Sequence, residues 1–270
     1  MDLAAPPVAA TIRLWGRPSS SNTQKVLWTL HEASLPFELT PASARMGASS
    51  QMRAGSREEA FGVVDTPEYR SMNPTGKVPT LADGDFTVFE SNTICRYIAE
   101  AHCPALLSGA GRGSALTAAQ QAAAASTWMD FSLDQNGADA ASFSSMCELV
   151  TRLPPAERGD PAALAAAVAA AASTIRVLDK HLQAVAAAEL AVPFVAGARF
   201  CVGDVPLGCE ITRWYCSLAA AKKQGFELPR PVPSFPHVRA WWERLRERPA
   251  FREGCGVHEA EHHGVDIDEV

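Results

Sequence analysis

The chain has 270 residues, of which 47% are hydrophobic and 20% are charged, a composition typical of a globular protein that buries a substantial core. Its formal net charge is −6, with acidic and basic residues interspersed, and it lacks the basic patch or stripe that a nucleic-acid-binding domain carries. This charge pattern argues against nucleic acid as a partner. The seven cysteines are scattered and include no Cys-x-x-Cys pair, which argues against a disulfide framework.

Two stretches bear on cellular location. Residues 1–10 have neither a positively charged region nor a long apolar core, so no secretory signal is predicted. The longest apolar run, Ala162–Ala172, is almost entirely alanine and is much shorter than the ~20 residues of a membrane span. Because alanine is the best helix former, we expect a surface or bundle helix there, no membrane contact and a cytoplasmic protein.

Strand-like and helix-like segments alternate through the first hundred residues. The predicted order is a strand at Thr11–Trp15, a helix from about Thr23, a strand at Phe37–Leu39, strands at Val78–Leu81 and Phe86–Phe89, and a helix from Ser91 to about Ala101. The turn residues Asp83 and Gly84 between two apolar runs are a strong hairpin signal. This order, β-α-β followed by β-β-α, fits a thioredoxin-like domain over residues 11–103.

The segment at about 43–60 interrupts this pattern. It is rich in serine, alanine, glycine and charged residues, follows no consistent period, and offers no bulky apolar anchors. Loops of this length inside a compact domain are either functional or disordered, and the composition favours disorder. We therefore predict a low-complexity insert in the N-terminal domain.

The second half of the chain reads as helical. Glycines near residues 109–113 mark a linker, and helical stretches follow at Ala118–Leu133, Pro161–Ala188, around Leu207–Leu218 and around Val238–Leu245. We predict an all-helical domain over residues 115–253 and an acidic, histidine-containing tail over 254–270. The fold class is thus α/β plus all-α, a thioredoxin-like N-terminal domain followed by an all-helical C-terminal domain.

Three motifs of the N-terminal half occur in a set order: Arg17–Val26 (RPSSSNTQKV), Asn73–Leu81 (NPTGKVPTL) and Phe89–Ala99 (FESNTICRYIA). Together they resemble the N-terminal domain of the cytosolic glutathione transferases. Downstream, Val202–Gly208 and Trp241–Arg252 are similar to the helical domain of that family. The resemblance covers most of residues 11–253 outside the insert, and it points to the serine-type, bacterial-like members.

The resemblance implies how these motifs bind glutathione, which carries two carboxylates, an ammonium group and a thiol. Lys77 pairs with the glycyl carboxylate, and the Val78 backbone pairs with the cysteinyl unit like an added strand. Pro79 occupies the position of a cis-proline. Glu90 accepts from the ammonium, and Ser91 with the free amides of a helix N-terminus suits the γ-glutamyl carboxylate.

The thiol of glutathione must then ionise. A free thiol has a pKa of about 8.5, and lowering it by about two units requires about 2.7 kcal/mol of preference for the thiolate. A hydroxyl donor beside a helix N-terminus supplies stabilisation of this size. Counting back six residues from Val26, as the resemblance implies, selects Ser20, with Ser21 next and Ser19 or Asn22 as further candidates.

The same loop bears on the reaction type. Family members that reduce disulfides place a cysteine here, and residues 15–25 contain none. We therefore expect a homodimeric glutathione transferase with a role in detoxification, which conjugates or adds glutathione, its co-substrate, to a small hydrophobic electrophile bound between the domains. The alternatives are a non-catalytic scaffold and a glutathione-dependent thiol–disulfide reductase that uses Cys103 or the tripeptide alone.

Two features have both a functional and a structural interpretation. His258–His262 matches the zinc-protease pattern H-E-x-x-H, but a tail bracketed by glycines does not predict the stable helix that the pattern needs, so no metal is expected. Arg213 lies in a helix otherwise built for burial, and it either forms a buried ion pair or reaches back to glutathione or its substrate.

One position departs from the family pattern. Where the family has serine or threonine three residues before the aspartate equivalent to Asp204, this chain has Cys201. The missing hydroxyl removes a helix cap and is expected to cost about 1 kcal/mol of local stability.

Overall fold

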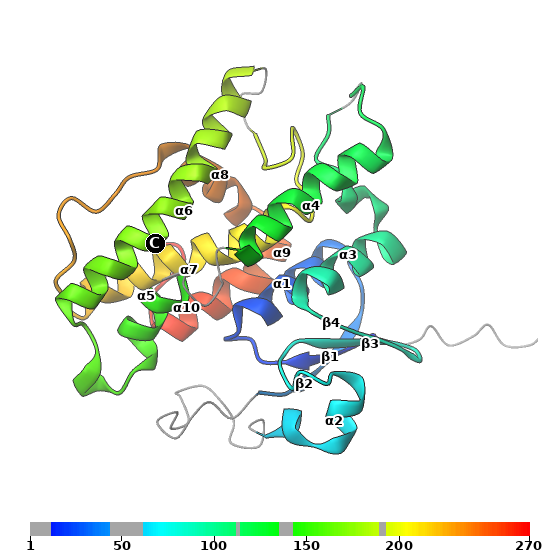
Figure 1. The fold of residues 1–270 in the computed structure, drawn as a ribbon, viewed down its shortest axis with the longest axis horizontal. Coiled ribbons are helices and arrows are strands. Elements are labelled where there is room, and N and C mark those ends of the chain that lie inside the picture. Colours follow the sequence, from blue (N-terminus) through cyan, green and yellow to red (C-terminus); the bar gives the residue numbers. More distant parts are fainter. Residues whose placement is uncertain (1–11, 44–61, 112–113, 135–142, 189–192) are drawn as a thin grey trace, which may run out of the picture.

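The computed structural model describes residues 12–43, 62–111, 114–134, 143–188 and 193–270, and the statements below concern these residues. The N-terminal half contains a four-stranded sheet in the order β2-β1-β3-β4 (Figure 1). Its strands are β1 (Ile12–Gly16), β2 (Phe37–Pro41), β3 (Thr80–Asp83) and β4 (Phe86–Phe89). The thioredoxin-like order predicted from the sequence is confirmed, and the predicted insert lies outside the described residues except for Ser43.

Pairing of the strands places one apolar face of the sheet under two helices. β1 runs parallel to β2 and antiparallel to β3, so that Leu14 lies opposite both Leu39 and Leu81. Leu14 and Leu81 are completely buried. They join a core to which α1 (Ser21–Glu32) and α3 (Ser91–His102) contribute and which continues into the helical half; these two helices cover this face of the sheet in Figure 1.

The opposite face of the sheet carries a smaller cluster. The turn Val63–Asp65 leads into α2 (Pro67–Met72), which begins with the Thr66 hydroxyl accepting from the Tyr69 amide and with proline at its first position. Tyr69 and Val64 are buried there against Trp15. The N-terminal half is therefore a sheet with helices on both faces.

The C-terminal half is helical. Its principal helices are α4 (Ala118–Asp134), α5 (Phe143–Cys147), α6 (Pro161–Ala188), α7 (Asp204–Lys223), α8 (Pro236–Arg246), α9 (Pro249–Phe251) and α10 (Val257–His263). Shorter turns are the 3-10 turns Pro104–Leu107 and Pro155–Glu157 and the π-helical turns Glu148–Arg152 and Arg252–Gly256. α7 passes through the middle of this half (Figure 1) and packs against α1, α4, α5 and α10.

Helix α6 has the bounds Pro161–Ala188 predicted from the sequence, and it extends well beyond the apolar run Ala162–Ala172. Residues 161–187 are long and apolar enough, by length and composition alone, to cross a membrane. An 18-residue window of this helix has a mean hydropathy of 1.6, and 44% of that window is buried inside the protein. Leu164, Val168 and Ile175 pack into the core, as expected for a core helix, so its composition is weak evidence for a membrane span.

Residues 254–270 differ from the prediction of an acidic tail. The turn Arg252–Gly256 packs so closely on α1 that a Cβ at Gly254 would lie 2.3 Å from the Cα of Trp28. Glu259 and Ile267 are also buried, in α10 and beyond it. The helical half thus continues past residue 253, because Glu259 and His263 are paired inside the protein, while Glu261, Asp266, Asp268 and Glu269 stay exposed.

Candidate active site

Strand pairing brings three loops together at one end of the sheet. Thr80 begins β3 and pairs with Phe89 at the end of β4, so the residues before Thr80 and after Phe89 emerge at the same edge. Trp15 near the end of β1 also pairs with Thr80, which adds the loop that leads into α1. A cleft of about 100 Å³ lies there, lined by Asn22, Asn73, Thr75, Lys77, Val78, Pro79, Glu90 and Ser91.

Six of these eight lining residues were predicted from the sequence as binding or catalytic residues: Asn22, Lys77, Val78, Pro79, Glu90 and Ser91. Ser20, Ser21 and Arg213, which were also predicted, are not among them. Asn73 and Thr75 were missed as cleft residues, although both belong to the Asn73–Leu81 motif.

The loop before β3 is held from behind by buried polar groups. The Tyr69 hydroxyl donates to the Lys77 carbonyl at 2.6 Å, and the Asn73 side chain donates to the same carbonyl at 3.0 Å. Asn73 also donates to the Thr80 hydroxyl at 2.9 Å. Because these bonds fix the Lys77 carbonyl, the Lys77 side chain is left exposed at the cleft.

The backbone at Val78 is available to a ligand. The Val78–Pro79 peptide bond is cis, as the family resemblance implies for this position. Within the described residues no backbone hydrogen bond engages Val78, which lies just outside β3. An extended peptide placed against this edge finds a free donor and a free acceptor.

The N-terminus of α3 forms the opposite wall of the cleft. Glu90 precedes the helix with a φ of 69°, a left-handed conformation that is uncommon for a residue other than glycine. Such conformations cost of the order of 1–3 kcal/mol and cluster at ligand sites. The first turn carries no acidic residue, so its free amides and the Ser91 hydroxyl are suited to a carboxylate.

The N-terminus of α1 contributes the remaining polar groups. Ser20 is the residue before the helix, is half-buried, and makes no capping hydrogen bond with its side chain. The side-chain oxygen Oδ1 of Asn22 accepts from the Ser91 hydroxyl at 3.3 Å and from the Lys25 ammonium at 3.0 Å. Ser21 is engaged elsewhere, because its hydroxyl accepts from Arg213 at 3.1 Å.

Lys25 was not recognised from the sequence as part of this region. Its side chain is only 1% exposed and lies 3.7 Å from the Glu210 carboxylate of α7. This buried pair links the Asn22 side chain to the helical half. The available signal was a lysine on the apolar side of a predicted helix, between Thr23 and Val26.

Arg213 forms the buried ion pair that was one of the two options considered for it, and it does not line the cleft. It is 2% exposed, and its guanidinium donates to the two carboxylate oxygens of Glu259 at 2.8 and 2.9 Å. It also reaches the α1 loop, donating to the Ser21 hydroxyl and, at 3.4 Å, to the Ser19 carbonyl. Burial alone would raise the pKa of Glu259, but the Arg213 guanidinium holds it well below its ordinary value of 4.5.

The H-E-x-x-H segment forms α10, which the sequence did not predict. Cys147, Glu259 and His263 are buried with ligand atoms within 4.8 Å of one another, a spacing that a metal ion could use. The Glu259 oxygens already accept from Arg213 and Gln24, and the adjacent guanidinium repels a cation. The same guanidinium lowers the pKa of Cys147 below 9.0 although burial opposes this. The charge of the Glu259 carboxylate in this cluster is thus already compensated by Arg213.

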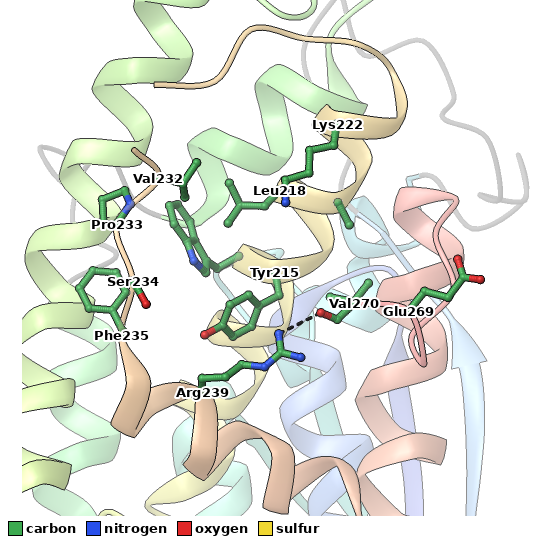
Figure 2. A pocket seen from close by; sticks show the side chains of 12 residues that line it. Tyr215, Leu218, Lys222, Val232, Pro233, Ser234, Phe235, Arg239, Glu269 and Val270 are labelled. Carbon is green, nitrogen blue, oxygen red and sulfur yellow. Dashed lines mark hydrogen bonds between the residues drawn. The ribbon is translucent and has the colours of Figure 1, made fainter. Parts of the chain in front are cut away.

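A second cleft, of about 430 Å³, lies in the helical half between α7, α8 and the segment that precedes α8 (Figure 2). Tyr215 and Leu218 line it from α7, and Arg239 lies across it, donating to the Val270 carbonyl at 2.9 Å. None of its lining residues comes from the N-terminal domain. It is therefore separate from the cleft at the end of the sheet.

Comparisons with known proteins identify the family of this chain. Residues 19–101 match the family described as glutathione S-transferase, N-terminal domain. The chain is 31% identical over 245 residues to glutathione S-transferase GstB of Escherichia coli, covering 90% of this chain and 96% of that protein. It is 29% identical to glutathione S-transferase 3 of Zea mays, covering 90% and 93%.

Solved structures give the same result. The crystal structure of the theta class glutathione S-transferase from the citrus canker pathogen Xanthomonas axonopodis pv. citri, with glutathione bound, is 35% identical. It superposes with a TM-score of 0.64 and covers 91% of this chain and 97% of that one. With the cleft, the fold and relatives matched over nearly their whole length, this chain belongs to the glutathione S-transferase family.

Proposed function

We propose that this transferase binds glutathione in the cleft at the end of the sheet and activates its thiol for conjugation or addition to a small hydrophobic electrophile. The observation that carries the proposal is the match between the cleft and the tripeptide. One wall offers the cation Lys77 and, at Val78, a peptide backbone that makes no backbone hydrogen bond to the described residues. The other offers the carboxylate of Glu90 and the amides and hydroxyl at Ser91.

Each group of glutathione then has a partner of opposite or complementary character. Lys77 takes the glycyl carboxylate, and Val78 pairs with the cysteinyl backbone as an added strand. Ser91 and the N-terminus of α3 take the γ-glutamyl carboxylate, while Glu90 accepts from the ammonium. This arrangement directs the cysteinyl thiol towards the N-terminus of α1.

At α1 we assign the donor to the thiolate first to Ser20. Its hydroxyl makes no capping bond, and it precedes a helix whose dipole favours negative charge. Ser21 is a weaker candidate, since its oxygen already accepts from the buried Arg213. Asn22 is the alternative, because it lines the cleft and its carbonyl oxygen, not its amide nitrogen, makes its two hydrogen bonds.

The absence of a cysteine from residues 15–25 favours conjugation over disulfide exchange. Cys103 follows the C-terminus of α3, twelve residues after Ser91 opens that helix, and does not line the cleft. The electrophile is proposed to bind beside the thiol against the helical half. There side chains of α3 reach α4, with the Asn92 side chain donating to the Met129 carbonyl at 2.6 Å.

We further propose a cytoplasmic homodimer with a role in detoxification. The surface argument for a dimer is β4, which is one of the two edge strands of the sheet. Phe86 on this strand is 51% exposed, and its ring lies 5.0 Å from that of Tyr97 on α3. An apolar edge of this kind is suited to burial against a second copy.

Titration calorimetry with glutathione, followed by mass spectrometry of the product formed with an activated aryl halide, tests the function. The proposal predicts binding of glutathione and a product in which its sulfur has displaced the halide. Disulfide reduction without a conjugate would favour the reductase, and the absence of glutathione binding would favour the scaffold.

Sedimentation analysis of wild type and Phe86→Asp tests the dimer, and an unchanged assembly in the variant contradicts the proposed surface.

A further inference from the structure

The turn between β1 and α1 is held by two buried side chains. Gln24 donates to the Pro18 carbonyl at 2.8 Å. Arg213 donates to the Ser19 carbonyl at 3.4 Å and to the Ser21 hydroxyl at 3.1 Å. The residues on both sides of Ser20 are therefore fixed, while the Ser20 side chain itself makes no capping bond.

Both of these side chains are anchored to one carboxylate. Glu259 accepts from Gln24 at 2.8 Å through Oε2. It accepts from Arg213 through Oε1 and Oε2, at 2.8 and 2.9 Å. Glu259 is completely buried in α10, and the bond to Gln24 joins residues 235 positions apart in the sequence.

We propose that Glu259 is a positioning residue for thiol activation, acting through Gln24 and Arg213 on the turn that carries Ser20. This inference rests on the proposed function. Glu259 does not line the cleft and touches no group that would touch glutathione. Its role is to set where the turn lies, and a hydrogen bond to a thiolate weakens steeply when donor and acceptor are displaced.

The arrangement separates activation from binding. The proposed binding groups Lys77, Val78, Glu90 and Ser91 belong to β3, β4 and α3 or the loops beside them, which Glu259 does not contact. Loosening the α1 turn therefore leaves glutathione bound. It raises the pKa of the bound thiol towards the free value, because the donor no longer occupies one place.

The test compares Glu259→Gln with Glu253→Gln, a matched control on the neighbouring turn whose side chain is 64% exposed. In Glu259→Gln we expect glutathione affinity within about threefold of wild type and a bound-thiol pKa higher by about one unit, a tenfold loss of thiolate at low pH. Glu259→Asp should recover part of the shift. The control should match wild type in both measurements.

A second readout follows the turn directly. Hydrogen exchange of the amides of residues 17–22 should accelerate in Glu259→Gln while that of residues 73–80 stays unchanged. Should Glu259→Gln fail to fold, the uncharged Gln24→Met variant, which removes the bond to Pro18, is expected to show the same changes at smaller size. Unaltered exchange at 17–22 in a folded variant overturns the inference whatever the wild-type thiol pKa is, whereas a wild-type thiol that ionises near its free value contradicts only the proposed function.

Discussion

Lys77 reaches the cleft because of what lies behind it. Two buried donors, from Tyr69 and Asn73, hold its carbonyl, so the backbone here cannot flip without breaking both bonds. Burial raises the pKa of Tyr69, which keeps its hydroxyl protonated and able to donate. The position of a single exposed cation is thus decided by neutral groups in the interior.

Replacing Lys77 with methionine should weaken glutathione binding about tenfold while preserving the fold. The substitution removes one charge-assisted contact to a carboxylate, which contributes about 1.4 kcal/mol when the pair is partly exposed. Calorimetry measures the change. Lys222→Met, at an exposed lysine near the end of α7, serves as the control, and equal affinity for the two variants would contradict the assignment.

At the scale of elements, α7 begins on a buried carboxylate rather than on a hydroxyl cap. Cys201 replaces the expected serine or threonine, but its backbone amide donates to Asp204 at 3.0 Å. The Val195 amide and the Trp241 indole donate to the same carboxylate, each at 2.9 Å. Asp204 therefore ties together three segments of the helical half.

Asp204→Ala is expected to lower the free energy of unfolding by about 3 kcal/mol, since it leaves three buried donors without an acceptor. Asp160→Ala, at the exposed start of α6 where one amide is capped at 2.7 Å, should cost only about 1 kcal/mol. Urea unfolding of both variants gives the comparison. Equal losses of unfolding free energy in the two variants would show that burial of the Asp204 hydrogen bonds adds nothing to stability.

Elements also show where sequence reasoning succeeds and where it fails. β4 is found at the predicted residues Phe86–Phe89, because apolar alternation and an Asp-Gly turn are local signals. β3 begins at Thr80 rather than at Val78, since Pro79 has no amide hydrogen to donate to the ladder. Most of the residues that line the cleft were also predictable, because they lie close together in the sequence, within residues 73–91.

The whole molecule adds what local patterns do not contain. Glu259 looked like a surface residue of an acidic tail, because its partners Arg213 and Gln24 lie 46 and 235 residues away. Nothing in the periodicity of residues 254–270 reveals that they return to α1. A carboxylate of the last segment thereby joins the first helix to the central helix of the C-terminal half.

The buried ion pair between Glu259 and Arg213 predicts a pH dependence of stability. The pKa of Glu259 is 4.5 in an unfolded chain and well below that in the folded protein, so its contribution to the free energy of unfolding is fully present above pH 4.5 and is lost as the pH falls further. The stability difference between wild type and Glu259→Gln should therefore shrink below pH 4.5. Urea unfolding across this range measures it, and a constant difference would contradict the ion pair.

The pKa of Asp204 is shifted in the opposite direction from that of Glu259. Burial raises the pKa of Asp204 from 3.8 to about 6, so its contribution decreases as the pH rises through that interval. Both proteins in the comparison retain Asp204. Its effect consequently cancels in the difference between them.

The central claim is that this transferase ionises glutathione beside Ser20 at the N-terminus of α1. The most direct measurement is the ultraviolet absorbance of the thiolate of bound glutathione against pH, for wild type and Ser20→Ala. We predict that wild type ionises the thiol about two units below its free pKa of about 8.5, and that Ser20→Ala binds glutathione but ionises it near the free value. A depressed pKa that persists in Ser20→Ala would transfer the role to Asn22 or Ser21, and a wild-type thiol that ionises near 8.5 would contradict activation at this site.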